Sequence, residues 1–316
     1  MNDIKRVAAS GNFGTPITTA LVKAGFDVTI ISRAESNATF PDGLPVIRIQ
    51  YTLETITDAL QGHHAAVCVV GPAGMGLQSM MVDAAAAAGV KRFIVDDFGW
   101  GIDMRGLPEF KDIHNHRRAG WDHAKAKAEA TAGFTFTGIS TGNPIDWVGS
   151  SSNPGIRAYV SNTRQALKRF PVMGFNIATR TAIIYDDGNE AFTGTTLQGI
   201  GQSVVGVLQH PEETANRFVR VLSIKTTQNQ LLAAFKEATG TEWEVQRSTT
   251  AALLESGRKK KAQGSGGWVL DLVVAQLLEQ GEARCVVAPS WEESDSGLLG
   301  VGHETAHGIV AKALNP

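Results

Sequence analysis

A short glycine-bearing segment near the start of the chain, residues 7–14, has residue types suited to binding phosphate. It follows a brief β-like run at residues 4–7 and leads into a helix-like stretch at residues 15–24. The amino terminus of a helix carries unpaired N–H groups and the positive end of the helix dipole. A strand, a glycine turn and a helix in this order therefore form a phosphate cradle for a dinucleotide. The spacing Gly11-x-x-Gly14 alone fits an ordinary strand-to-helix connection equally well.

The end of the second strand-like run carries the residues that would choose between two dinucleotides. In such sites a carboxylate at this position selects the 2′-hydroxyl of NAD, whereas an arginine accommodates the 2′-phosphate of NADP. The run at residues 26–32 ends with Ser32 and is followed by Arg33. A guanidinium group can form two hydrogen bonds to one phosphate, so this end favours NADP. The alternative is a solvated surface arginine.

The most common proton-donating pair of short-chain reductases is absent from the sequence. That mechanism needs Tyr-x-x-x-Lys on one helix, where the lysine lowers the pKa of the tyrosine. The chain has three tyrosines, and the residues four positions after them are Thr55, Thr163 and Asn189. The tyrosine mechanism is therefore excluded.

Two short motifs match hydrolase signatures, but the neighbouring residues that each signature requires are missing. His303-Glu304-Thr305-Ala306-His307 has the zinc-protease spacing, but the residues after it include no His, Asp or Glu to complete a zinc site. A polar face of a terminal helix is the better interpretation, and no metal is expected. Ser140 stands in a G-x-S-x-G pattern, yet an Asn-Pro pair follows in place of the required helix. A strand end followed by a turn is the better interpretation there.

Strand-like and helix-like runs alternate through the first half of the chain. This alternation is typical of a parallel sheet with helices on both faces. Strands are expected at residues 26–32, 45–49, 65–71, 92–95 and 135–140, and helices near 15–24, 53–60, 78–88 and 121–132. The polar stretch at residues 109–118 is expected either to contact substrate or to form a solvated loop. The predicted fold class is α/β, a Rossmann-like doubly wound parallel sheet.

The pattern becomes irregular after Gly142. Residues 142–155 are loop-like, and later strands are expected at residues 180–185 and 218–224. Helices are expected at residues 197–208, 228–239 and 268–280. We expect residues 1–150 to form an NAD(P)-binding domain. Residues 151–316 are expected to form a smaller α+β substrate-binding region, interleaved with the last elements of the sheet.

Composition places the chain among ordinary globular proteins. Of its 316 residues 43% are hydrophobic and 19% are charged, and the net charge of −2 gives no footprint for nucleic acid. No stretch reaches the roughly 18 apolar residues that span a membrane, and no signal region begins the chain, so a cytoplasmic protein is expected. Cys68 and Cys285 lie in apolar runs and are expected to be buried thiols. A monomer or homodimer with a small-molecule substrate is expected.

Several segments together resemble the NmrA-like, isoflavone-reductase-like family of atypical short-chain dehydrogenases. The most specific is Ala87-Ala88-Gly89-Val90-Lys91-Arg92-Phe93-Ile94, which leads to Asp97-Phe98-Gly99. The segments at residues 9–14, 28–33, 141–144 and 227–231 extend the resemblance over most of the chain. The resemblance implies NADPH as cofactor, and in many members reduction of a specialised metabolite.

The resemblance also assigns cofactor contacts residue by residue. Those it implies are Ser10, Gly11, Asn12, Phe13 and Gly14 for the pyrophosphate, Ser32 and Arg33 for the 2′-phosphate, and Gly71, Pro72, Phe98, Gly99, Lys125, Asn143 and Pro144 further along the cofactor. The family's reductases use a lysine on the helix after the fifth strand, and Lys125 fits that position, in a Lys-x-x-x-Glu pattern with Glu129. Lys127 remains an alternative.

The first strand departs from the family pattern. Ala8 stands where the family has another glycine, and Lys5 and Arg6 are unusual in a central strand buried on both faces. We expect these changes to loosen the pyrophosphate cradle. The leading hypothesis is an NADPH-dependent oxidoreductase that reduces a small specialised metabolite by hydride transfer, with Lys125 near the reacting centre. The alternatives are an NADP-binding regulator without turnover and a cofactor-binding scaffold for a redox-neutral isomerisation or cyclisation.

Overall fold

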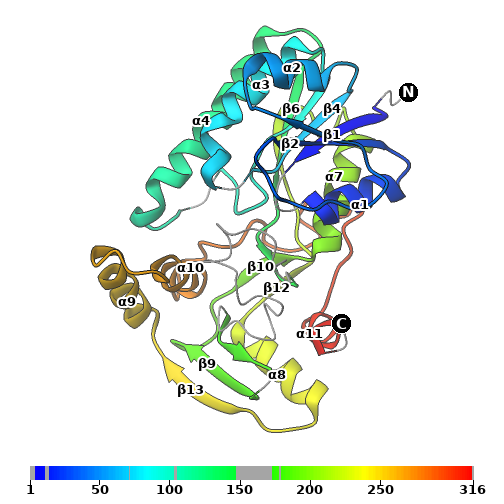
Figure 1. Cartoon of the computed structure of the whole chain (residues 1–316). Helices are drawn as coiled ribbons and strands as arrows, with labels where there is room; N and C mark the ends of the chain where they lie inside the picture. Colours follow the sequence, from blue (N-terminus) through cyan, green and yellow to red (C-terminus); the bar gives the residue numbers. More distant parts are fainter. Residues whose placement is uncertain are drawn as a thin grey trace.

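A central sheet of parallel strands organises the first half of the computed structural model, which describes residues 4–10, 14–70, 72–102, 105–146, 173–177 and 179–314 (Figure 1). The strands of this sheet are β1 (Arg6–Ser10), β2 (Asp27–Arg33), β3 (Val46–Ile49), β4 (Ala65–Cys68), β5 (Arg92–Ile94), β6 (Thr135–Ser140) and β11 (Arg217–Arg220). Their order is β11-β6-β5-β4-β1-β2-β3, and every neighbouring pair is parallel.

Helices cover both faces of this sheet. The covering helices are α1 (Gly14–Lys23) and α7 (Leu197–Gln209) on one face, and α2 (Leu53–Leu60), α3 (Gln78–Ala87) and α4 (Lys111–Ala130) on the other (Figure 1). All four residues of β4 are buried, as a strand covered on both faces requires. The doubly wound prediction is confirmed.

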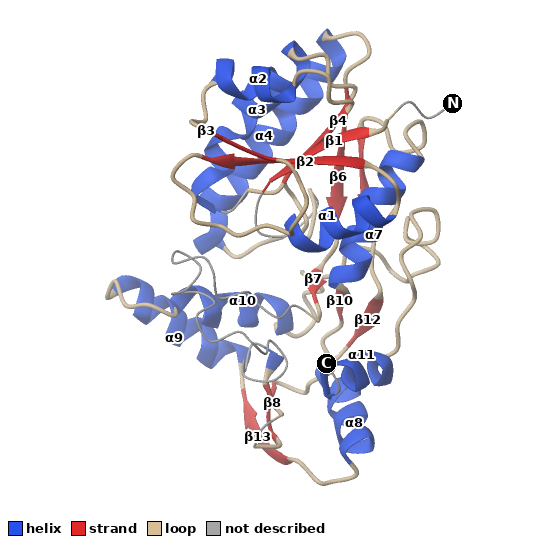
Figure 2. Cartoon of the chain, turned by 45° about the vertical axis from the view of Figure 1, so that its right-hand side comes forward, coloured by secondary structure: helices blue, strands red, loops and turns tan. Residues whose placement is uncertain are grey.

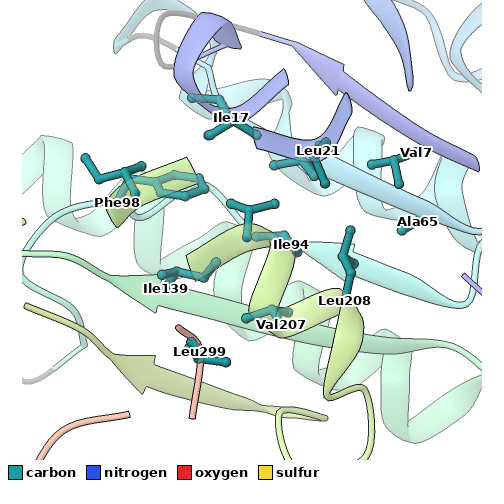
Figure 3. Packing of buried hydrophobic residues seen from close by; sticks show 14 of the residues in the cluster. Val7, Ile17, Leu21, Ala65, Ile94, Phe98, Ile139, Val207, Leu208 and Leu299 are labelled. Carbon is teal, nitrogen blue, oxygen red and sulfur yellow. The ribbon is translucent and has the colours of Figure 1, made fainter. Parts of the chain in front are cut away.

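The face beneath α1 and α7 holds one of the two apolar clusters of the sheet. Ile17 and Leu21 of α1 and Val207 of α7 meet Val7 and Ile94 of the sheet, and all five side chains are fully buried (Figure 3). The two helices also approach each other closely. A Cβ at Gly201 of α7 would lie 2.6 Å from the carbonyl oxygen of Pro16 in α1, so the contact needs glycine at that position.

The second half of the chain builds two small sheets with their own helices (Figure 2). The strands are β7 (Asn143–Pro144), β10 (Phe192–Thr195) and β12 (Ile224–Thr226) in one sheet, and β8 (Phe175–Asn176), β9 (Thr181–Tyr185) and β13 (Glu244–Ser248) in the other. The helices are α8 (Gln228–Thr239), α9 (Thr250–Ala262), α10 (Trp268–Leu278) and α11 (Ala306–Leu314). Two short 3-10 helices, η1 (Pro72–Leu77) and η2 (Pro108–Phe110), complete the described elements. Because α7 and β11 return to the central sheet after β10, the two regions are interleaved.

Helix α4 begins ten residues earlier than the sequence pattern indicated. The polar stretch at residues 109–118, expected as a loop or a substrate contact, forms η2 and the first half of this helix. The loop prediction was wrong because it relied on apolar periodicity to detect a helix. In α4 only Gly120, Trp121 and Ala124 are buried, so the other positions can be polar.

Three further boundaries differ from the prediction. Residues 218–224 do not form one strand, because Arg217–Arg220 joins the central sheet and Ile224–Thr226 joins a small one. Asn143–Pro144, expected in a loop, pairs with β10. The first strand extends to Ser10, so residues 7–10 belong to the strand rather than to the turn.

Other features of the chain agree with the sequence. Cys68 and Cys285 are both free and buried, as expected. No helix in the described part of the chain is both long and apolar enough to cross a membrane.

A buried arginine joins β5 to β6 and to the segment after α7. Arg92 is 2% exposed, and its Nε donates to Thr135 Oγ1 at 2.8 Å. Its Nη1 donates to Thr137 Oγ1 and to Thr214 Oγ1, both at 2.9 Å, and its Nη2 donates to the carbonyl oxygen of Pro211. These four partners are neutral, and burial lowers the pKa of Arg92 to about 10.

We expect Arg92→Met to lower the free energy of unfolding by about 2–4 kcal/mol, because each buried acceptor left unpaired costs roughly 1–3 kcal/mol. Urea unfolding followed by circular dichroism measures the loss. The control is Arg247→Met on exposed β13, which we expect to stay within about 0.5 kcal/mol of the parent chain. Equal stability of the two variants would contradict the structural role of Arg92.

Candidate functional site

The carboxyl ends of β1 and β4 lie side by side at the centre of the sheet. Ser10 is paired with Cys68 in the ladder between these strands. From β1 the chain continues to α1 on one face of the sheet, and from β4 it continues to η1 and α3 on the other. A crevice outside the carboxyl ends forms where the connections diverge in this way, and doubly wound sheets bind ligands there.

Part of the predicted cofactor set lies where the structure gives no description. Gly11, Asn12, Phe13 and Gly71 are outside the described residues. For Ser10 and Pro72 the backbone is described, in β1 and at the start of η1. These assignments therefore stay predictions.

Gly14 opens α1 directly after residues 11–13, which lie outside the described residues. A Cβ placed on Gly14 would meet no described atom within 4 Å. A side-chain-free first residue leaves the amino end of α1 accessible to a ligand on this side, as a pyrophosphate-binding helix end requires. The side chain of Ala8, which replaces a family glycine, is buried with Ile31, Ile56 and Met81 on the opposite face of the sheet. The extra methyl group therefore points away from α1.

Ser32 and Arg33 end β2, the neighbour of β1, as the sequence predicted. Ser32 is buried, whereas the side chain of Arg33 is 52% exposed. Arg33 Nη1 lies 3.4 Å from Glu35 Oε1, in an ion pair that water screens strongly. Such a pair contributes little, so the guanidinium can turn to another anion at small cost.

Phe98 and Gly99 follow β5 and differ in how they face the site. Phe98 has a φ of 44°, which is uncommon for a residue other than glycine, and its ring is buried in the cluster beneath α1 and α7 (Figure 3). Only its backbone is therefore available to a cofactor. The carbonyl oxygen of Gly99 accepts hydrogen bonds from the N–H groups of Thr141 and Gly142, each at 2.8 Å.

Asn143 and Pro144 lie in β7, at the start of the second region. Asn143 Nδ2 donates to the carbonyl oxygen of Thr193 in β10 at 3.2 Å. A left-handed turn at Gly142, with a φ of 63°, brings the chain from β6 into β7. A Cβ at Gly142 would lie 2.6 Å from the carbonyl oxygen of Thr193, so this crossing requires glycine.

The two candidate lysines of α4 have different surroundings. Lys125 is exposed, one helical turn beyond buried Trp121, and no hydrogen bond or ion pair to another described residue holds it. Lys127 is half-buried, and its Nζ lies 2.6 Å from Asp83 Oδ1 of α3. His123 Nε2 shares the same carboxylate at 2.9 Å. Lys127 therefore joins α4 to α3, and Lys125 is the lysine left available for other contacts.

A buried pair of carboxyl groups after β5 is the most unusual polar feature of this edge. Asp96 is 3% exposed and Asp97 is 2% exposed. Asp97 Oδ2 accepts a hydrogen bond from Ser140 Oγ at the end of β6 at 2.8 Å. Arg117 Nε of α4 lies 3.9 Å from Asp96 Oδ2, too far for a direct hydrogen bond. The polar first half of α4 thus supplies a cation beside two buried acids.

Burial dominates the protonation of these acids. It raises the pKa of Asp96 to about 7, with the charge of Arg117 opposing the shift and that of Asp97 adding to it. Burial also raises the pKa of Asp97, against the opposing effects of Arg117 and the Ser140 hydroxyl. Strongly shifted carboxyl groups gather at functional sites, although structural pairs show such shifts as well.

Gln78, the first residue of α3, connects β5 to α4. Its Oε1 accepts the N–H of Asp96 at 2.6 Å, and Trp121 Nε1 of α4 donates to the Asp96 carbonyl oxygen at 3.0 Å. A Cβ at Gly120 would lie 2.2 Å from Gln78 Nε2. In the described part of the chain, Gln78 Nε2, Asp96 Oδ2 and Arg117 Nε are buried without a hydrogen-bond partner.

Sequence reasoning assigned no role to Gln78 or Asp96, and it considered Arg117 only within the polar stretch at residues 109–118. Two adjacent acids directly after an apolar strand, at the carboxyl edge of a parallel sheet, are a signal that was present in the sequence. For Gln78 and Arg117 no comparable signal exists, since only the packing of α3 and α4 brings them to Asp96.

The two hydrolase-like motifs form no hydrolase site. His303 precedes α11 rather than lying on it, and its ring stacks on Trp291 with centroids 5.6 Å apart. No group of three or more potential metal ligands occurs among the described residues. Ser140 ends a strand and donates to Asp97, with no helix after it.

We expect Asp96→Asn to stabilise the chain increasingly as pH rises. In the folded chain Asp96 keeps its proton up to a pH of about 7. In the unfolded chain the same carboxyl has the ordinary pKa of 3.8 and loses its proton at a much lower pH. The stability that this group contributes is therefore present at about pH 4 and is lost as pH rises to about 7.

Unfolding free energies of the variant and the parent chain, measured in urea from about pH 4 to 8, test this. The free energy of unfolding of Asp96→Asn minus that of the parent chain should rise with pH and level off above about pH 7. Asp122→Asn, which changes an exposed residue of α4, is the control. A pH-independent difference for Asp96→Asn would contradict the raised pKa.

Comparison with known proteins gives the same picture of the first half of the chain. Residues 8–148 match the family model described as NAD(P)H-binding. Oxidoreductase poxI of Penicillium oxalicum is 63% identical over 306 residues, which cover 97% of this chain and 92% of that protein. The chain is thus homologous to an oxidoreductase, and its first half is an NAD(P)H-binding domain.

Solved structures with low sequence identity share the fold. Leucoanthocyanidin reductase of Vitis vinifera, in a binary complex with NADPH, has a TM-score of 0.73 at 16% identity, with 98% of this chain and all of that chain covered. An isoflavone reductase has a TM-score of 0.69 at 17% identity, with 98% and 99% covered. The chain belongs to the same family as oxidoreductase poxI, and its fold is that of the isoflavone-reductase-like proteins that the sequence resembles.

Proposed function

We propose that this protein is an NADPH-dependent oxidoreductase that reduces a small specialised metabolite by hydride transfer. One observation carries the proposal: the NAD(P)H-binding match at residues 8–148 coincides with the crevice where β1 and β4 lie side by side. Homology to oxidoreductase poxI and the fold shared with an NADPH-bound reductase support it.

The residues around the crevice suit an NADP-type dinucleotide. The open amino end of α1 at Gly14 would receive the pyrophosphate, and Arg33 at the end of β2 would contact the 2′-phosphate. The backbone at Phe98 and Gly99 would border the nicotinamide half. When bound, NADPH supplies the hydride for the reduction.

The protein itself must supply or position a proton for the reduced product. Lys125 is our candidate, because Lys127 is held by Asp83 and the tyrosine mechanism is excluded. Its amine would donate a proton to the substrate atom that gains negative charge, or would orient the cofactor ribose. A second candidate function is an NADP-binding regulator without turnover, because an exposed Lys125 also fits a lysine that takes no part in catalysis.

We expect Arg33→Ala to weaken NADPH binding by about 10- to 100-fold and to leave NADH binding within about twofold. A charge-assisted hydrogen bond contributes roughly 1.5–3 kcal/mol to binding. NADH has no 2′-phosphate, so its binding does not depend on this contact. Fluorescence titration of the full chain with each cofactor measures the two affinities. Arg247→Ala, on exposed β13, is the control. If the parent chain binds NADH as tightly as NADPH, the NADP assignment is wrong.

We expect Lys125→Met to lower the turnover number by about 100-fold or more, with little change in NADPH affinity, since general acid catalysis contributes roughly 10²–10⁴-fold. Loss of NADPH absorbance with a panel of small carbonyl, imine and conjugated alkene compounds measures turnover. Lys127→Met is the matched control, and its effect should be on stability instead.

The same assay distinguishes the candidate functions. Binding of NADPH with no turnover on any compound would favour the regulator. Conversion of a compound without net loss of NADPH would favour a redox-neutral isomerisation or cyclisation. Failure to bind NADPH at near-millimolar concentration would remove the oxidoreductase proposal.

A further inference from the structure

Asp96 lies between two backbone segments that the proposed function places along the cofactor. It follows β5 and stands three residues before Gly99, where the nicotinamide half is proposed to lie. The N–H of Val70, two residues after β4, also lies against the Asp96 carboxyl group and favours its charged form. Gly71 and Pro72, two predicted cofactor contacts, come directly after Val70. Asp96 therefore lies where the charge of a bound nicotinamide would act on it.

The charges around the Asp96 carboxyl group are not closely paired. Asp96 is 3% exposed, and its Oδ2 is buried without a hydrogen-bond partner among the described residues. Arg117 Nε, 3.9 Å from that oxygen, is likewise buried without a partner. The next cation on α4, Arg118, donates instead to the carbonyl oxygen of Ile102 at 3.0 Å. Arg117 thus faces two buried acids, Asp96 and Asp97, without a close hydrogen bond to Asp96.

The other described side chains that contact this cluster are neutral near pH 7. Burial raises the pKa of the Cys68 thiol, which ends β4 next to Asp96. Burial also lowers the pKa of His114, on the first half of α4. Gln78 of α3 and Trp121 of α4, which hydrogen-bond to the Asp96 backbone, carry no charge. The ionisation of Asp96 therefore depends on burial, on its two charged neighbours and on whatever binds beside it.

The two forms of the cofactor would act differently on this acid. Burial raises the pKa of Asp96 to about 7, against the charge of Arg117, so that near neutral pH both its protonated and its charged forms are populated. A positive charge nearby favours the charged form of an acid, whereas a neutral group does not. The nicotinamide ring supplies this contrast, because it is positively charged in NADP+ and uncharged in NADPH.

Arg117 connects Asp96 both to solvent and to the proposed nicotinamide site. Its side chain is 25% exposed, so a proton can be exchanged with solvent past it. Its Nη1 lies against Gly99, 3.3 Å from the position of a Cβ on that residue. A movement of about 1 Å would bring Arg117 Nε within hydrogen-bond distance of Asp96 Oδ2. The charged form of Asp96 can therefore be paired without a rearrangement of the fold.

We propose that Asp96 stores a proton according to the oxidation state of the cofactor: it holds the proton beside NADPH and releases it beside NADP+. The inference rests on the proposed function, because it needs the nicotinamide half at Phe98 and Gly99. In turnover the substrate gains the hydride from NADPH and a proton from Lys125. The Asp96 O–H bond breaks separately, its proton leaves to solvent, and the carboxylate stabilises the oxidised cofactor. Asp96 regains a proton when NADP+ dissociates.

Isothermal titration of the full chain with NADP+ and with NADPH, in two buffers that differ in their enthalpy of ionisation, measures the protons released on binding. For a pKa lowered by about one unit, NADP+ should release about half a proton more than NADPH at about pH 6.5. The affinity for NADP+ relative to NADPH should also rise about tenfold between about pH 5 and 8. The 2′-phosphate is common to both cofactors, so its own protonation cancels from the comparison.

Two variants assign the proton to this cluster. Asp96→Asn should remove the difference in proton release between the two cofactors. Arg117→Gln should move the rise in relative affinity upward by about one pH unit, because it removes the cation that opposes the raised pKa of Asp96. Asp122→Asn, which changes an exposed acid of α4, is the control and should behave as the parent chain. Thermal unfolding of each variant checks that the fold is retained.

Equal proton release with both cofactors in the parent chain would contradict the proposal, and so would a difference that Asp96→Asn leaves unchanged. If Asp96→Asn does not fold, an unshifted pH dependence in Arg117→Gln would contradict it instead. The same titrations keep the two proposals apart. A parent chain that binds neither cofactor would remove the oxidoreductase function together with this inference, whereas binding of both with equal proton release would remove only the role of Asp96.

Discussion

The parallel pairing of β1 with β4 is the constraint on which the rest of the site depends. Parallel neighbours cannot be joined by a tight turn, so each strand must be followed by a crossover on one face of the sheet. After β1 the crossover uses α1, and after β4 it uses η1 and α3 on the opposite face. The carboxyl ends of the two strands are left open between these connections.

The carboxyl edge of the central sheet also holds two buried acidic side chains, which are electrostatically unfavourable there. Asp96 and Asp97 are buried side by side, where charged carboxylates are unfavourable. Arg117 lies near both acids without a close hydrogen bond to Asp96. Apolar residues at these positions would pack at lower cost. The arrangement is therefore better explained by a requirement for polar groups beside the crevice than by stability.

Helix α4 connects these features. Its polar first half places Arg117 beside the two acids. Its buried Gly120 leaves room for the Gln78 side chain, and Trp121 donates a hydrogen bond to the Asp96 carbonyl oxygen. Its second half presents Lys125 to solvent and attaches to α3 through Lys127 and Asp83. One helix thus sets the positions of the acids after β5 and of the candidate proton donor.

The sequence by itself determined the class of the fold, because apolar runs, glycine stops and their alternation are local properties. It also located Arg33 at the end of the second strand, while Phe98 and Gly99 were implied by the family resemblance. Only the tertiary structure decided that residues 111–118 are helical, that Ala8 faces away from α1, and that Arg117 and Gln78 reach Asp96. A small cavity likewise brings Trp100 and Ile102 next to the strand ends at Ser140 and Arg220 and next to Arg284 and Val286. Contacts between segments so distant in the chain depend on how helices and sheets pack, and no local pattern encodes them.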